Sequence, residues 1–157
     1  MNIELRKIRR ADAKDIAKIL SNKKVLKTLD PGHPFPMPIS YVEDKIPIDQ
    51  TNWKKGKAYK FVILNNKKIV GQISLYNPNK SKNKYEIGCF VGEKFWNKGI
   101  ATKAIQKIAK FGFNKLKISK MWAVPSINNP ASSRALEKAG FKLEGIKNKQ
   151  MFWEITR

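Results

Sequence analysis

The hydrophobic residues of the N-terminal third recur at different periods and predict a strand, a helix and a loop. Residues 2–9 mix apolar and polar side chains in partial alternation, which indicates an edge strand. Asp12 and Asp15 then stand where an N-cap and a first-turn acid belong, so a helix should follow. Its apolar residues at helical spacing are Ile16, Ala17, Ile19 and Leu20. Residues 30–38 hold four of the eight prolines and predict an ordered surface loop.

A capping-box pattern marks the start of a second helix. Ser40 and Glu43 have the spacing at which each side chain accepts a free backbone N–H of the first turn. We therefore expect a helix from Ser40 to about Lys55. Pro47 should kink this helix, and Gly56 should end it.

The middle of the chain predicts a three-stranded meander. Residues 59–64, 68–76 and 84–92 are rich in side chains that favour strands. Residues 65–67 make a short hairpin connection between the first two strands, and the polar residues 77–83 make a turn to the third.

After residue 93 the period changes to that of an amphipathic helix, which should run from about Gly99 to Leu116. Its apolar stripe is Ala101, Ala104, Ile105, Ile108 and Gly112, and its basic stripe is Lys103, Lys107 and Lys110. The remaining predicted elements are a strand at 121–124, a helix at 130–139 and strands at 141–146 and 150–155. Without repeats or a linker, residues 1–157 should form a single α+β domain.

The composition excludes a wholly disordered basic chain, and it indicates a strong positive electrostatic field around the protein. Hydrophobic residues make up 41% of the 157 residues and aromatic residues 10%, which is enough for a core. The formal net charge is +21. Almost all basic residues are lysine, so the charge indicates attraction to polyanions such as RNA or ribosomal surfaces rather than base-specific recognition. A general lysine bias and an adaptation to heat are alternative explanations.

The chain also predicts a location and argues against metal chemistry. Its longest apolar runs, 61–64 and 121–124, are far too short to cross a bilayer, and the N-terminus lacks the apolar core of a secretory signal. The single Cys89 cannot form an internal disulfide, so we expect a cytoplasmic protein. The chain has a single histidine, His33, and a single cysteine, so no metal site is expected. Cys89 should pack as a small buried side chain.

A motif at the start of the long amphipathic helix predicts phosphate binding. The sequence F-W-N-K-G-I-A-T at 95–102 follows a strand and opens a helix, with small residues where bulky side chains would block close approach. Free N–H groups of the first turn and the positive end of the helix dipole suit a pyrophosphate. Neither of the common nucleotide fingerprints, G-x-x-x-x-G-K-[ST] or G-x-G-x-x-G, is present.

A second motif, N-x-x-S-x-x-x-L-E-K-A-G-F at 129–141, follows at the distance of one helix and one strand. The two motifs together resemble the GNAT N-acetyltransferase superfamily, in particular the branch of ribosomal-protein-alanine N-acetyltransferases of the RimJ/RimL type. The proline loop at 34–36 and the strand at 85–88 also resemble that branch. The resemblance implies a mixed, mostly antiparallel, splayed sheet of about seven strands flanked by about four helices. Acetyl-CoA would insert between the strands at 84–92 and 121–124.

The resemblance also implies the residues that bind acetyl-CoA. Main-chain groups of Cys89, Phe90 and Val91 would meet the pantetheine arm, and one N–H there would polarise the thioester carbonyl. The pyrophosphate would lie on the N–H groups of Trp96, Asn97, Lys98, Gly99, Ile100, Ala101 and Thr102. Asn129 would hydrogen-bond the pantetheine, and Ser132 would lie near the thioester sulfur.

Two positions depart from the wider family. Many members have a tyrosine as general acid where this chain has Leu136, so the leaving thiolate would be protonated by Ser132, by water or not at all. The first position of the phosphate motif, usually Gln or Arg, is Trp96, and Lys98 is a candidate to supply the missing charge.

Glu86 aligns with the candidate general base of the branch and would act through one water. By strand alternation it shares a sheet face with Gly88 and Phe90, while Tyr85, Ile87, Cys89 and Val91 share the other. The alternative is a carboxylate paired with one of the many lysines. A positive environment also lowers the pKa of an amine, so a dedicated base is not obligatory.

The leading functional hypothesis is therefore acetyl transfer from acetyl-CoA to a primary amine, most directly a protein N-terminal amine, by direct attack without an acyl-enzyme. His33, Phe35 and Met37 in the proline loop are candidates to contact the acceptor. One rival is a non-catalytic RNA- or ribosome-binding module with this fold. Another is acetylation of a polyamine or aminoglycoside, whose positive charge would require the acids Glu43, Asp44 and Asp49 on the acceptor side.

Overall fold

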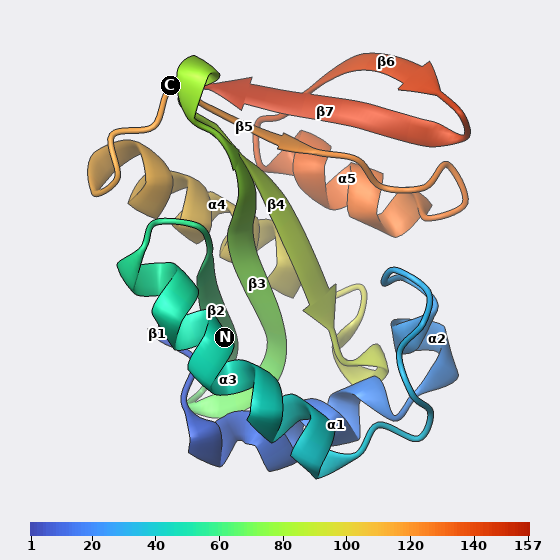
Figure 1. Ribbon diagram of the computed structural model, residues 1–157. Coiled ribbons are helices and arrows are strands. Elements are labelled where there is room, and N and C mark those ends of the chain that lie inside the picture. Colours follow the sequence, from blue (N-terminus) through green and yellow to red (C-terminus); the bar gives the residue numbers. More distant parts are fainter.

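A computed structural model describes all residues from Met1 to Arg157. Seven strands form one sheet in the order β1-β2-β3-β4-β5-β7-β6, in which only the β4–β5 pair is parallel (Figure 1). The strands are β1 (Ile3–Lys7), β2 (Tyr59–Asn65), β3 (Lys68–Asn79), β4 (Lys84–Val91), β5 (Lys120–Ala123), β6 (Lys142–Lys147) and β7 (Gln150–Thr156). This confirms the predicted mixed, mostly antiparallel sheet, with β1 at one edge.

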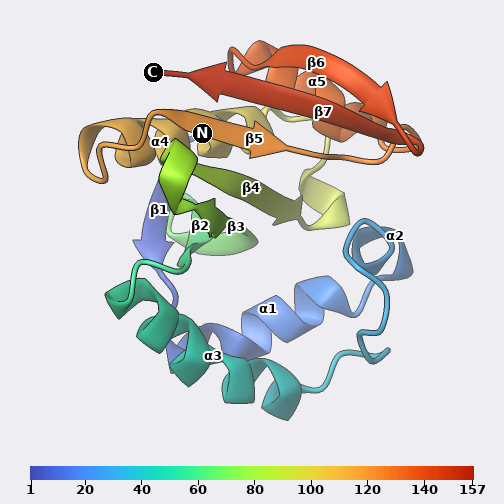
Figure 2. The ribbon, with the colours of Figure 1, turned by 45° about the horizontal axis from the view of Figure 1, so that its top comes forward.

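Helices cover both faces of the sheet, with α1 and α3 on one side and α4 and α5 on the other (Figure 2). The helices are α1 (Ala13–Leu20), α2 (Lys23–Leu26), α3 (Ile39–Lys54), α4 (Ile100–Asn114) and α5 (Pro130–Lys138). The short α2 is the one helix that the sequence pattern did not predict; Asn22 caps it by accepting the N–H groups of Lys24 and Val25. None of the helices combines the length and apolar character needed to span a membrane.

Each sheet face carries its own hydrophobic core. A cluster of 20 buried residues lies between the sheet, α4 and α5, and a cluster of 12 lies under α1 and α3. Along β4, Ile87 and Val91 belong to the larger cluster and Phe90 to the smaller one. The predicted alternation of β4 is therefore confirmed, and the strand presents different side chains to the two halves of the molecule.

The sheet splits between β4 and β5. The two strands pair over only three positions, from Lys84 opposite Lys120 to Glu86 opposite Trp122. β4 then continues to Val91 without a partner on that side, which confirms the splayed sheet that the family resemblance implied. The backbone groups on this edge of β4 are consequently free to bind something other than a neighbouring strand.

The capping box predicted for the second helix is wrong. α3 begins at Ile39 with Pro38 at its N-cap, and no side chain caps it. Ser40 lies inside the helix, and the Glu43 carboxylate pairs instead with Arg10 at 3.5 Å. The helix continues through Pro47, and Gly56 follows it in the left-handed region with φ +68°, as its predicted role as terminator requires.

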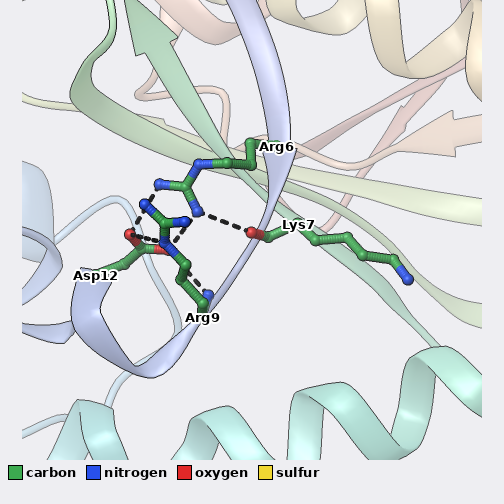
Figure 3. A network of polar contacts seen from close by, with 4 residues as sticks. All are labelled: Arg6, Lys7, Arg9 and Asp12. Atoms are coloured by element: carbon green, nitrogen blue, oxygen red, sulfur yellow. Dashed lines mark hydrogen bonds and ion pairs between the residues drawn. The ribbon is translucent and has the colours of Figure 1, made fainter.

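Asp12 stands at the N-cap of α1, as predicted, but its carboxylate does not cap that helix. It accepts the backbone N–H of Arg9 at 2.9 Å and two hydrogen bonds, at 3.1 and 2.9 Å, from the Arg6 guanidinium of β1 (Figure 3). Asp12 is only 3% exposed. The network therefore fastens the start of the first helix to the edge strand.

We predict that Asp12→Ala destabilises the fold by about 2–4 kcal/mol, because it removes a buried carboxylate and leaves the Arg6 guanidinium without its partner. Urea unfolding should show a lower midpoint at an unchanged slope. The matched control is Arg10→Ala, which breaks the exposed pair with Glu43 and should cost no more than about 0.5 kcal/mol. Equal stability of the two variants would contradict the role of Asp12.

Candidate active site

A cleft of about 570 Å³ lies beside the part of β4 that is not paired with β5. It is bounded by the end of that strand, the start of α4 and one face of α5. We call it the α4–α5 cleft. It brings together nearly all residues that the two sequence motifs indicated. Those lining it are Cys89, Phe90, Val91, Trp96, Asn97, Gly99, Ile100, Ala101, Thr102, Asn129 and Ser132. Lys98 is the exception, since it is exposed and does not line the cleft.

The turn before α4 exposes the backbone of the first helical turn to the cleft. Asn97 and Gly99 adopt left-handed conformations, with φ +60° and +78°, and no side chain caps α4. The N–H groups of Ile100, Ala101 and Thr102 therefore have no intrahelical acceptor and no side-chain acceptor. Together with the positive end of the helix dipole, they form a surface suited to an anion.

Trp96 holds this turn in place. Its indole N–H donates to the carbonyl of Val91 at 2.7 Å, so the side chain ties the turn back to the end of β4. The ring remains 38% exposed and contributes to the cleft wall. Trp96, which stands where Gln or Arg is usual, thus has a structural partner at the end of β4.

Helix α5 forms the opposite wall. Asn129 is its N-cap, and the side-chain oxygen accepts the N–H of Ser132 at 3.4 Å, which leaves the amide NH₂ group without a protein acceptor. The Ser132 hydroxyl makes no hydrogen bond within the protein, whereas the neighbouring Ser133 is buried and bonded to Met151 and Trp153. Both Asn129 and Ser132 therefore have polar atoms available to a ligand.

Several residues of this cleft were not predicted from the sequence. Ala131, Arg134, Ala135 and Lys138 line it from α5, and Thr28 lines it from the segment after α2. The four α5 residues follow the i, i+3, i+4, i+7 spacing of one helix face, a signal that could have identified them from the sequence. Arg134 and Lys138 add two positive charges to the cleft wall.

Glu86 lies outside this cleft, on the face of the sheet that α1 and α3 cover. It is 9% exposed and accepts two hydrogen bonds, from the Tyr76 hydroxyl at 2.8 Å and from the Asn77 amide at 3.1 Å. No Lys, Arg or His lies within salt-bridge distance of it, so the alternative of a lysine partner is not realised. Burial, followed by the hydrogen bond to Glu86, raises the pKa of Tyr76.

A second cavity, of about 320 Å³, opens on the Glu86 face, and we call it the loop cavity. His33 and Met37 line it, as the candidate acceptor contacts should, but Phe35 does not: it is 48% exposed, with the Lys23 ammonium over its ring. Cys89 and Phe90 line both this cavity and the α4–α5 cleft. The two spaces therefore meet near the C-terminal end of β4.

The acids of the loop cavity are only partly those expected. Asp49 lines it but pairs with Lys60 at 3.0 Å, while Glu43 and Asp44 do not line it. Asp30 lines it without a salt-bridge partner. Cys89 is a free thiol whose pKa burial raises to about 12, so it remains protonated at neutral pH. No group of three or more His, Cys, Asp or Glu side chains is arranged to hold a metal ion.

A third hollow, of about 830 Å³, lies on the other side of Glu86, and we call it the β4–β7 hollow. Its lining includes Asn77, Trp122, Glu144, Phe152 and Glu154. Glu154 is shared by the ammonium groups of two lysines, at 3.8 Å from Lys84 and 3.5 Å from Lys120. Of the two residues bonded to Glu86, Tyr76 lines the loop cavity and Asn77 lines the β4–β7 hollow.

Comparisons with known proteins agree with this architecture. YoaA of Bacillus subtilis, named as an uncharacterized N-acetyltransferase, is 29% identical over 154 residues, which is 97% of this chain and 86% of that protein. Mycobacterium smegmatis RimJ in complex with CoA-disulfide superposes with a TM-score of 0.88 at 21% identity, over 98% of this chain and 81% of that one. The ribosomal-protein-S5-alanine acetyltransferase from Vibrio fischeri gives 0.88 at 20% identity, over 99% and 93%. These two structures share the fold.

The relationship extends over most of the chain. The family model described as an acetyltransferase (GNAT) domain matches residues 2–142, from the edge strand β1 to the start of β6. That range contains the split between β4 and β5, the uncapped turn before α4 and the polar N-terminus of α5. The chain therefore belongs to the GNAT family of N-acetyltransferases.

Proposed function

We propose that the protein transfers the acetyl group of acetyl-CoA to a primary amine, and that the amine is a protein N-terminus. The observation that carries this proposal is the meeting of two cavities on β4: the α4–α5 cleft and the loop cavity share Cys89 and Phe90. A cofactor in the first space and an acceptor in the second would approach the same few backbone atoms. Such an arrangement would bring an amine next to a thioester.

The α4–α5 cleft suits coenzyme A along its length. The uncapped N–H groups at 100–102 would bind the pyrophosphate, with Arg134 and Lys138 adding positive charge. The free amide of Asn129 and the main chain of Cys89–Val91 would bind the pantetheine arm. Family membership supports the same assignment, because GNAT enzymes use acetyl-CoA.

In the proposed reaction the acceptor amine first loses a proton toward Glu86. Its nitrogen lone pair then attacks the thioester carbon, and a main-chain N–H near Cys89 stabilises the carbonyl oxygen as it gains negative charge. The C–S bond breaks, the nitrogen gives up its second proton as the amide forms, and the coenzyme A thiolate takes up one proton, delivered by water or by Ser132, which regains it from water. Cys89 is an unsuitable nucleophile because its thiol stays protonated, which favours direct attack over an acyl-enzyme.

The charges of the acceptor side favour a protein N-terminus over a polyamine. Asp49 is engaged by Lys60, and Glu154 is engaged by two lysines, so two of the four acids there are already neutralised. Asp30 and Glu144 are the remaining carboxylates of the two spaces beside Glu86. Two spaces flanking Glu86 give room for a chain that extends past the reacting amine.

The lysine-rich surface supports a weaker, electrostatic role. Lys103, Lys107 and Lys110 of α4 are exposed and begin next to the α4–α5 cleft, where they would attract the anionic end of the cofactor. The net charge of +21 would also attract RNA or a ribosomal surface. Both this attraction and the cytoplasmic location stay predictions.

Ala101→Asp should abolish most cofactor binding without destabilising the fold. The new carboxylate faces the α4–α5 cleft and repels the pyrophosphate, while an acid in the first turn of α4 favours the helix. Calorimetry should show acetyl-CoA affinity falling about tenfold or more, or about 1.4 kcal/mol. Gln106→Asp adds the same charge on an exposed position outside the cleft and should bind normally. Absence of heat with the unaltered protein would overturn the cofactor assignment.

Glu86→Gln should lower kcat by about 10²–10⁴-fold, because the proton acceptor is lost. Ser132→Ala should cost about tenfold or less, since a thiol with pKa near 8.5 leaves with little assistance. The measurement is release of free coenzyme A thiol with three acceptors: a peptide with a free N-terminal alanine, its N-blocked form with an internal lysine, and spermidine. Glu4→Gln, on the edge strand, is the control and should have no effect.

The same experiment separates the rival functions. Transfer to the free peptide alone supports the N-terminal acceptor, and transfer to spermidine alone overturns it. Acetyl-CoA binding with no thiol release for any amine favours a binding module that retains the fold. Unchanged turnover in both Glu86→Gln and Ser132→Ala would remove those two assignments and leave acetyl transfer itself intact.

A further inference from the structure

The proposed base is not accessible to the acceptor directly. Glu86 is 9% exposed and lines neither of the two spaces beside it. Its carboxylate oxygens are each covered by one donor, Oε2 by the Tyr76 hydroxyl and Oε1 by the Asn77 amide. These two groups are therefore the protein groups in direct contact with the carboxylate, and the first candidates to pass it a proton.

Of the two, only the Tyr76 hydroxyl can release one proton and accept another while staying hydrogen-bonded to Glu86, with the direction of that bond reversed. An amide donates hydrogen bonds but does not transfer protons at neutral pH. Tyr76 is also on the side that matters, because it lines the loop cavity, which meets the α4–α5 cleft at Cys89. Asn77 instead lines the β4–β7 hollow.

The ring of Tyr76 lies across β4 at the glycine before Cys89. A Cβ added to Gly88 would come within 3.1 Å of the Cε1 atom of Tyr76. The ring can therefore pack at this position because residue 88 has no side chain. Gly88 itself lines the loop cavity. The tyrosine thus extends from the buried Glu86 to the strand segment where the two cavities meet.

We propose that Tyr76 is a catalytic residue that relays the proton of the acceptor amine to Glu86; this inference rests on the proposed function. The acceptor ammonium gives one N–H proton to the Tyr76 oxygen as the Tyr76 O–H proton moves to Glu86 Oε2. The products are a neutral amine, a neutral tyrosine and a protonated Glu86, so proton and charge balance. The amine then attacks the thioester, and Glu86 later returns its proton to solvent.

The surroundings keep Tyr76 protonated between turnovers. Burial, the hydrogen bond to Glu86 and the negative charges of Glu86 and Asp30 all raise its pKa. The other titratable groups that face the loop cavity from neighbouring elements are His33, Tyr41, Lys45, Asp49, Lys60 and Cys89. Among these, only an imidazole ordinarily changes charge near neutral pH, and His33 is present equally in every variant compared below.

The test is the pH dependence of kcat/KM for Tyr76→Phe with the peptide bearing a free N-terminal alanine. Without the relay only the free amine reacts, so the rate should rise about tenfold per pH unit up to the amine pKa near 8. The deficit relative to the unaltered enzyme should be about 10²-fold near pH 6.5 and shrink to within about tenfold near pH 9. Acetyl-CoA affinity should not change.

Two comparisons exclude a merely structural effect. The double variant Tyr76→Phe/Glu86→Gln should be about as slow as Glu86→Gln alone, because residues that act as one unit are not additive. Tyr85→Phe makes the same change on the opposite face of β4, where the hydroxyl donates to Gly56 at 2.6 Å, and should keep the normal pH profile.

A Tyr76→Phe enzyme with the normal pH profile, whether fully active or uniformly slower, would overturn the relay. Additive losses in the double variant would overturn it as well. If the unaltered protein transfers acetyl to no amine, the proposed function fails first and the relay fails with it. The two failures are therefore distinguished by the activity of the unaltered protein.

Discussion

The active-site architecture depends on one constraint, the early separation of β4 and β5. Pro125 follows β5 closely and has no N–H to continue the parallel ladder. The chain there bonds to the other side instead, since the Pro125 carbonyl accepts the Met151 N–H at 2.9 Å and Ile127 donates to Lys149 at 2.8 Å. The segment after β5 is thus drawn toward β7, and β4 is left with one unpaired edge on which an extended ligand can lie.

The alternation of β4 then assigns the two faces of that edge to different tasks. Side chains directed toward α4 and α5 complete the larger core and leave the backbone next to the α4–α5 cleft. Side chains directed toward α1 and α3 include Glu86 and Phe90, together with the bare position of Gly88. A single strand would therefore place the proposed cofactor site and the proposed proton acceptor on opposite sides of the same backbone.

Features encoded locally could be predicted from the sequence, and features that depend on tertiary contacts could not. The turn before α4 and the start of α5 were found because glycine, proline and small residues mark them directly. The capping box of α3 failed because the helix begins at Ile39, which leaves Ser40 inside it, and Glu43 forms an ion pair with Arg10 of another element. Tyr76 was missed because its pairing with Glu86 follows from the β3–β4 register, which shifts just beyond Tyr76.

The lysine-rich composition makes the isolation of Glu86 a chemical requirement. An ammonium beside a carboxylate favours its charged form and so makes it a weaker proton acceptor. In a chain of net charge +21, only burial behind neutral donors keeps lysines away, and Tyr76 and Asn77 provide this. The surrounding positive field meanwhile lowers the pKa of an approaching amine. The excess of lysine and the neutral shell around Glu86 are therefore compatible with the proposed proton transfer.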